Sequence, residues 1–351
     1  MAYTTIDDPT IYFNTLIYTG NGSSGRSVTG VGFQPDWVWI KNRSDGDPHK
    51  IFDSVRGVSK SLKSNSTDVE ASTEENGYVS AFNSDGFTLT QGSSSQDDVN
   101  KSSENYVAWN WLAGGSASSN SNGTETSNVS ANTTAGFSII TYSGTTAVDT
   151  YGHGLSQKPE MMILRTRAGA NRNWVVYHKD VGATKHLHLN STAAEATDQY
   201  MFNNTEPTTS VITLSDEGEV NKSGSTYVGY IFHGVKGYSK FGKYTGNGNA
   251  DGTFVYTGFK PAFVMIKKSS ATQNWVIVDN KRAISNPIGE RLNPNLSNAE
   301  STDGERINFL SNGFKVTTTA ELFNGSGGTY IYMAFAESPF TNSNGVPNNA
   351  R

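Results

Sequence analysis

The sequence predicts an all-β protein made of three tandem β-sandwich modules of jelly-roll-like character. One set of motifs recurs three times in the same order, which indicates a repeated structural unit. The composition is also typical of strands joined by tight turns: the chain has 36 glycines, 11% aromatic residues and only 17% charged residues. No convincing helix is predicted, and the best candidate, residues 193–199, is only a turn or two long.

The clearest repeat is the pattern Leu-x-x-Asn-x-x-x-x-Glu, which lies between an apolar strand that follows a proline and an aromatic strand opened by a tyrosine. We interpret these positions as a structural framework, in which the Asn side chain fixes a turn and the Glu satisfies backbone donors. The framework residues are Pro35, Leu62, Asn65, Glu70 and Tyr106 in the first copy, Pro159, Leu187, Asn190, Glu195 and Tyr227 in the second, and Pro261, Leu292, Asn295, Glu300 and Tyr330 in the third.

The repeats divide the 351 residues into modules of roughly 100 residues, a usual domain size. The segment 113–135 is rich in Gly, Ser and Asn and is expected to be a flexible linker or an exposed loop. The start of the chain is expected to be a loosely ordered arm, with docking onto a neighbouring subunit as the alternative. The predicted boundaries are 1–15 for the arm, 16–112, 136–233 and 234–340 for the three β-sandwich modules, and 341–351 for a surface tail.

The first apolar strand of each module is predicted to be covered on both faces. In the first copy, Trp37 and Trp39 point to one side and Val38 and Ile40 to the other, because side chains alternate along a strand. A sandwich has only one inner face per sheet. The second face is therefore expected to be covered by a sister module or by another subunit, and the tryptophans are expected in the sandwich core.

Composition excludes several classes of partner. The formal charge of −5 gives no electrostatic footprint for nucleic acid. No run approaches the ~18 apolar residues of a spanning helix, so no membrane insertion is predicted. The N-terminus lacks the features of a signal peptide, and cysteine is absent. We expect synthesis in a cytoplasm and export by a route other than secretion.

No catalytic, metal-ligating or cofactor-binding residue is predicted. His186 and His188 would share one face of a strand, but a metal site needs further ligands, so two solvent-facing strand residues are the preferred interpretation. The pairs Asp45/Asp47 and Asp97/Asp98 offer oxygen ligands for calcium, yet turn chemistry is preferred.

The three framework glutamates also invite a catalytic interpretation. A glycosidase requires two carboxylates that face each other across a substrate, whereas each module offers one glutamate at the matched position. A structural role is therefore preferred, and the protein is expected not to be an enzyme.

Five further motifs stand out in the sequence: Thr5–Pro9, Leu16–Gly22, Tyr106–Gly115, Ser297–Glu300 and Gly328–Glu337. In these motifs the chain resembles a family of virion structural proteins from tailed bacteriophages, notably those of marine bacteria. The resemblance implies a virion component, of the tail-fibre or tail-associated kind, that works as a homo-oligomer, with a trimer favoured. It carries no catalytic residue. Alternatives are a capsid-surface decoration protein, or a module that binds or degrades a host polysaccharide.

Overall fold

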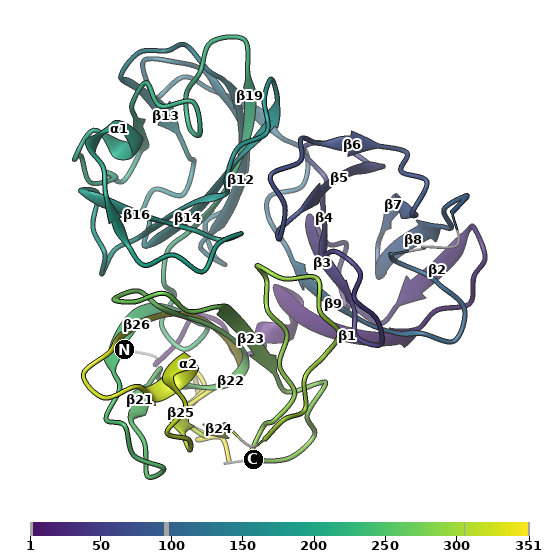
Figure 1. Ribbon diagram of the computed structural model, residues 1–351, viewed down its shortest axis with the longest axis vertical. Coiled ribbons are helices and arrows are strands. Elements are labelled where there is room, and N and C mark those ends of the chain that lie inside the picture. The colour runs from purple at the N-terminus through teal and green to yellow at the C-terminus, as the bar shows by residue number, and fades with distance from the viewer. Residues whose placement is uncertain (1–2, 95–97, 305, 350–351) are drawn as a thin grey trace.

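The computed structural model describes residues 3–94, 98–304 and 306–349. It confirms an all-β fold of three sandwich modules, which lie as three lobes around a common centre (Figure 1). Each lobe packs a larger antiparallel sheet against a smaller one. The described helices are short: a 3-10 turn at Pro9–Ile11, α1 (Gln199–Phe202) and α2 (Glu321–Asn324). Within the described residues, no helix has the length and apolar character needed to cross a membrane.

Module one has a six-stranded sheet and a three-stranded sheet. The larger sheet has the order β1 (Phe13–Thr19), β9 (Asn105–Trp111), β3 (Trp37–Asn42), β4 (Lys50–Asp53), β5 (Lys60–Lys63) and β6 (Ala71–Ser72). The smaller sheet has the order β2 (Arg26–Thr29), β8 (Gly86–Thr90) and β7 (Tyr78–Asn83).

Modules two and three repeat this plan. In module two the larger sheet has the order β10 (Ser118–Asn120), β11 (Ser127–Asn132), β12 (Phe137–Ser143), β19 (Thr226–Phe232), β14 (Met161–Ala168), β15 (Val175–His178), β16 (Lys185–His188) and β17 (Ala196–Thr197), and the smaller pairs β13 (Asp149–Gly152) with β18 (Val211–Leu214). In module three the larger sheet has the order β20 (Ser239–Thr245), β26 (Thr329–Pro339), β22 (Phe259–Lys268) and β23 (Trp275–Asp279), and the smaller has the order β21 (Phe254–Tyr256), β25 (Gly313–Val316) and β24 (Ile307–Leu310).

Part of the segment expected to be a linker is sheet. Strands β10 and β11 lie inside 113–135 and extend the larger sheet of module two at its edge, where β11 pairs with β12. Residues of β11 alternate only weakly in polarity, since Ser130 takes a buried position beside Val129. The backbone ladder holds these strands, so composition alone did not reveal them.

The N-terminal arm docks onto module three of its own chain rather than lying loose. The Tyr3 hydroxyl donates a hydrogen bond to the carbonyl of Gly258 (2.8 Å), and the Thr4 hydroxyl donates one to the carbonyl of Lys236 (2.8 Å). Ile6 is buried in the core between the modules, and β1 already begins at Phe13. The described part of the tail, residues 341–349, has no buried residue.

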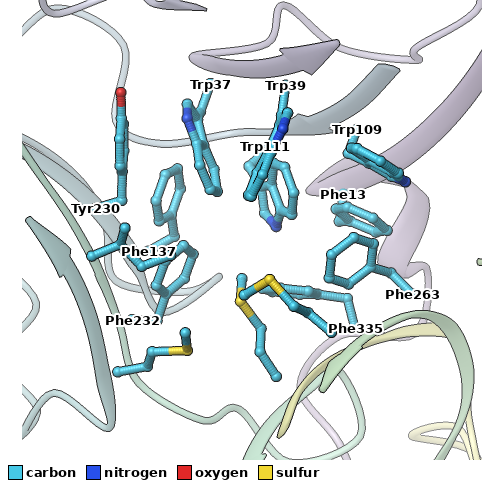
Figure 2. Close-up of a cluster of buried hydrophobic side chains, with 14 of the residues drawn as sticks. Phe13, Trp37, Trp39, Trp109, Trp111, Phe137, Tyr230, Phe232, Phe263 and Phe335 are labelled. Carbon is cyan, nitrogen blue, oxygen red and sulfur yellow. The ribbon is translucent and has the colours of Figure 1, made fainter. Parts of the chain in front are cut away.

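Both faces of each larger sheet are buried, in two different cores. On β3, Val38 and Ile40 face the smaller sheet of module one, whereas Trp37 and Trp39 face the centre of the molecule. The centre is one continuous cluster to which all three modules contribute (Figure 2). The second apolar face is therefore covered by sister modules, which was one of the two expected solutions.

The central core holds all six tryptophans of the chain: Trp37, Trp39, Trp109, Trp111, Trp174 and Trp275. They are not in the sandwich cores, where they were expected. Aromatic contacts join the modules directly, because Trp37 stacks on Tyr230 of module two with 4.5 Å between ring centroids. Phe13 likewise stacks on Phe335 of module three at 5.1 Å. The three modules thus form one packed unit.

Candidate functional site

The framework glutamates close the three modules into a ring. The backbone N–H of Glu70 donates to the carbonyl of Arg167 in module two (2.9 Å). The N–H of Glu195 donates to Ser269 in module three (2.8 Å), and that of Glu300 donates to Arg43 in module one (2.9 Å). The same position in every repeat therefore contacts the next module around the ring.

Two of these glutamates also bind arginines from both sides of the junction. Glu300 accepts hydrogen bonds from Arg43 of module one (2.6 Å) and from Arg282 of its own module (2.8 Å). Arg282 is fully buried and also donates to Asp279 (2.6 Å). Such charge-assisted bonds are stronger than neutral ones. This junction is a largely buried ion-pair network, with Arg43 at its partly exposed edge.

The junction between modules one and two repeats that network. Glu70 accepts from Arg167 (2.9 Å) and from the buried Arg56 (3.1 Å), which is paired in turn with Asp53. Burial alone would raise the pKa of Glu70, but the hydrogen bonds and charges of the two arginines hold this pKa below its ordinary value. The carboxylate is therefore fixed as an anion.

Module two departs from the pattern at the third junction. His178 and Val181 of module two stand where module one has Asp53 and Arg56 and module three has Asp279 and Arg282. Across the junction, Ser269 of module three stands where modules one and two have Arg43 and Arg167. Among the described residues, the side chain of Glu195 forms an ion pair with Lys185 of its own module alone (2.6 Å), and both groups are partly exposed. Of the three junctions, this one has the weakest ionic contact.

A second cyclic set of contacts uses the framework asparagines. Trp174 and Trp275 donate from the indole nitrogen to the carbonyls of Lys63 and His188 in the preceding module (both 2.9 Å). His49 takes the equivalent place in module one, 3.1 Å from the carbonyl of Asn293. The backbone N–H of each of these three residues donates to the framework asparagine of its own module: Asn65 (3.2 Å), Asn190 (2.9 Å) and Asn295 (3.0 Å).

The remaining framework residues are structural as well. The Tyr106, Tyr227 and Tyr330 hydroxyls accept from the backbone N–H groups five residues earlier, at 2.9, 2.8 and 2.7 Å. Leu62, Leu187 and Leu292 lie in the central core. Pro35 and Pro159 precede β3 and β14, as expected for strand starts, but Pro261 lies inside β22, at a register irregularity.

Sequence reasoning missed three buried cations at matched positions: Lys41, Arg165 and Lys267. The Lys267 ammonium donates to the carbonyls of Lys268 (2.8 Å) and Gln273 (2.9 Å), and to Thr192 of module two (3.1 Å). Burial lowers the pKa of Lys267 to about 8. The sequence did contain a signal for these residues, because a basic residue recurs six positions after the framework proline in every module.

The matched glutamates do not form a hydrolytic pair. Each lies at a different junction, and each is held by basic side chains. A general acid must present its carboxyl group to the substrate, whereas each of these carboxyl groups is already engaged by a basic side chain. The geometry supports the structural interpretation of Glu70, Glu195 and Glu300.

The acidic pairs considered for calcium have other partners. Asp45 lies 3.4 Å from the ammonium of Lys101, Asp47 accepts from Asn42 (2.5 Å), and Asp98 lies 3.0 Å from Lys50. Asp97 is outside the described residues. These contacts fit turn and ion-pair chemistry.

The two histidines of β16 do not face solvent as expected. His186 is buried and His188 is partly buried, both on the face opposite Leu187, which enters the central core. The loop between β18 and β19 brings Glu219 to His188, with 2.8 Å between Nε2 and the carboxylate. No motif in the sequence indicated Glu219.

Two adjoining surface hollows lie where module two meets β20 and β21 of module three. They share Lys179, Lys240 and Tyr256. Phe254 and Tyr256 on β21 are 44% and 48% exposed, which is unusual for large aromatic side chains. The Lys240 ammonium lies 5.2 Å from the centre of the Tyr256 ring. Exposed apolar side chains gathered at a hollow mark a candidate binding surface.

The fold and its junctions define the chain as an all-β protein of three fused sandwich modules around one core. It belongs to the family described as Domain of unknown function (DUF7483), whose model matches residues 8–339. No curated protein sequence and no solved structure matches the chain.

Proposed function

We propose that the protein is a non-enzymatic structural component of a tailed-phage virion, a tail fibre or tail-associated protein. The observation that carries this is the central aromatic core, to which every module commits one face of its larger sheet. The matched positions of the repeat act in packing and in ion pairs at the junctions. The chain has no cysteine, so it has no disulfides. Packing and ion pairs between the modules would supply the stability that a particle component needs without them.

The resemblance supplies the virion assignment, and it also supplies the proposed homo-oligomer, with a trimer favoured. The fold removes one physical reason for that oligomer, because the apolar faces already pack within one chain. Light scattering on the purified chain measures the oligomeric state. A mass near the 37.8 kDa of one chain contradicts the homotrimer.

Immunogold labelling of purified particles tests the virion assignment. Antibody raised against the chain should label the particle at the tail, and peptides of the chain should appear in the mass spectrum of gradient-purified virions. Label on the head instead supports the alternative of a capsid decoration protein. Absence from purified particles overturns the proposal.

A second candidate function is the binding of an acidic polysaccharide at the hollows beside Tyr256. Lys236 and Lys240 lie over the rings of Tyr3 and Tyr256, and neither makes an ion pair within the described residues. The site thus offers sugar-stacking faces next to ammonium groups that have no carboxylate partner.

Glycan-array binding followed by calorimetry tests this second function. Tyr256→Ala and Lys240→Gln should each weaken binding of an acidic glycan at least several-fold. Tyr200→Ala is the matched control, because Tyr200 is 53% exposed and does not line these hollows. Equal binding by the control and the two site variants removes this candidate.

A further inference from the structure

Module two contains a cluster of metal-ligand side chains that lie outside the contacts between modules; of these residues, His188 takes part in such a contact through its backbone carbonyl, which accepts from Trp275. His186, His188 and Glu219 each place a ligand atom within 4.8 Å of the other two. His186 is only 5% exposed, and its Nδ1 has no hydrogen-bond partner in the part of the chain that the structure describes. An unpaired nitrogen at a buried position costs free energy unless something binds it.

The carboxylate of Glu219 is held in place from behind. Asn173 donates from its side-chain nitrogen to Oε1 of Glu219 (2.6 Å), and its own side-chain oxygen accepts from the framework residue Asn190 (2.9 Å). Oε2 is left facing His188. Hydrogen bonds that orient a ligating carboxylate in this way are a regular feature of metal sites.

Module one shows what occupies the equivalent place when the imidazoles are absent. Asp98 corresponds to Glu219, because the residues that follow them, Val99 and Val220, each accept a hydrogen bond from a tyrosine at 2.7 and 2.8 Å. The Lys50 ammonium lies 3.0 Å from Asp98.

Module two lacks that built-in cation. Lys50 lies opposite Lys63 across β4 and β5, and the same place in β15, opposite His188, is taken by Val175. At this corner of the sandwich, module one therefore pairs its carboxylate, Asp98, with the ammonium of Lys50. Module two instead places its carboxylate, Glu219, beside two imidazoles.

We propose that His186, His188 and Glu219 bind a divalent first-row metal ion, Zn²⁺ in the first place. Two imidazole nitrogens and one carboxylate oxygen are a ligand set that Zn²⁺ accepts, with water in the fourth position. Ligand atoms around tetrahedral zinc lie roughly 3.4 Å apart for bonds of about 2.1 Å, so small side-chain movements close this cluster. Imidazole ligands favour Zn²⁺ over Ca²⁺ or Mg²⁺, which take oxygen ligands.

Calorimetric titration of the chelator-treated full chain with ZnCl₂ tests the proposal, with Co²⁺ as a spectroscopic probe. One equivalent of Zn²⁺ should bind per chain, and the Co²⁺ complex should show the visible bands of a four-coordinate site. His188→Asn and Glu219→Gln should each weaken Zn²⁺ binding at least ~10-fold. Asn173→Ala, which changes a positioning residue, should weaken it about 10-fold.

His233→Asn is the control, because it removes an imidazole outside the cluster and should leave Zn²⁺ affinity unchanged. Tryptophan fluorescence of each variant shows whether the central core is intact, and His188 is exposed enough for its variant to fold. The proposal is overturned if the chain binds no Zn²⁺, or if the double variant His188→Asn/Glu219→Gln binds it as tightly as the parent. Either result leaves the proposed structural role in a virion untouched.

Discussion

Removal of the Glu300 charge should destabilise the protein far more than the same change at Glu195, although the two residues hold the same position in the repeat. In Glu300→Gln, the carboxylate that binds Arg43 and Arg282 becomes a neutral amide. Glu195→Gln removes only the pair with Lys185. The comparison therefore isolates the buried network, since the backbone contact to the next module exists in both places.

The magnitude follows from burial. The Glu300 side chain is 8% exposed and that of Arg282 is fully buried. Removing one partner of a buried pair costs about 3–5 kcal/mol. Arg282 keeps its bond to Asp279, so we expect the lower end, about 3 kcal/mol. Glu195 and Lys185 are 24% and 37% exposed, and an exposed pair contributes about 0–1 kcal/mol.

Urea unfolding followed by tryptophan fluorescence measures both variants, because all six tryptophans report on the central core. Glu70→Gln should behave like Glu300→Gln. The reasoning is refuted if Glu195→Gln lowers the free energy of unfolding as much as Glu300→Gln does, or if Glu300→Gln costs less than about 1 kcal/mol.

Three further predictions concern the core, pH and the framework. Trp37→Ala should cost about 3–5 kcal/mol and lower hydrogen-exchange protection in all three modules, whereas loss confined to module one would contradict a shared core. His49, His153 and His178 each accept an N–H at Nδ1, and the Nε2 of each lies within hydrogen-bond distance of a carbonyl. Burial lowers the pKa of His153 to about 4 and that of His178 to about 3, from 6.5. The unfolded chain therefore binds more protons, and the free energy of unfolding should fall below pH 6.5 by about 1.4 kcal/mol per pH unit for each group until its folded pKa is reached. A urea series from pH 7 to 4.5 that shows no such fall, or the same slope in His178→Gln, contradicts this. Asn190→Ala should cost about 1–2 kcal/mol by releasing the start of β15, measured against Asn122→Ala at an exposed bend.

The sequence predicted that both faces of β3 are covered, because Trp37, Val38, Trp39 and Ile40 leave neither side polar. It could not say what covers the second face, since periodicity records burial and not the partner. Recurrence favoured a structural interpretation of the framework asparagines and glutamates. Their contacts to the next module required coordinates, because the partner carbonyls carry no side-chain signal.

Other features were hidden for specific reasons. Lys41 and Lys267 are charged residues in apolar strands, and a charge is normally taken as a sign of exposure. Their ammonium groups donate hydrogen bonds to backbone carbonyls, and no sequence motif indicates a site made of backbone carbonyls. Glu219 lies 31 residues after His188, in a loop whose path depends on the packing of both sheets. Spacing rules cover only ligands that are near in sequence.

The covalent fusion of three modules also frees each copy to change alone. In an assembly of three identical chains, a substitution at the Glu195 position would weaken every junction at once. Here the arginine pair is lost at one junction and kept at the other two. The same freedom allows an imidazole pair in module two where module one keeps Ser61 and Lys63. A single polypeptide can therefore carry different residues at matched positions of its three modules, whereas a homotrimer of one-module chains cannot.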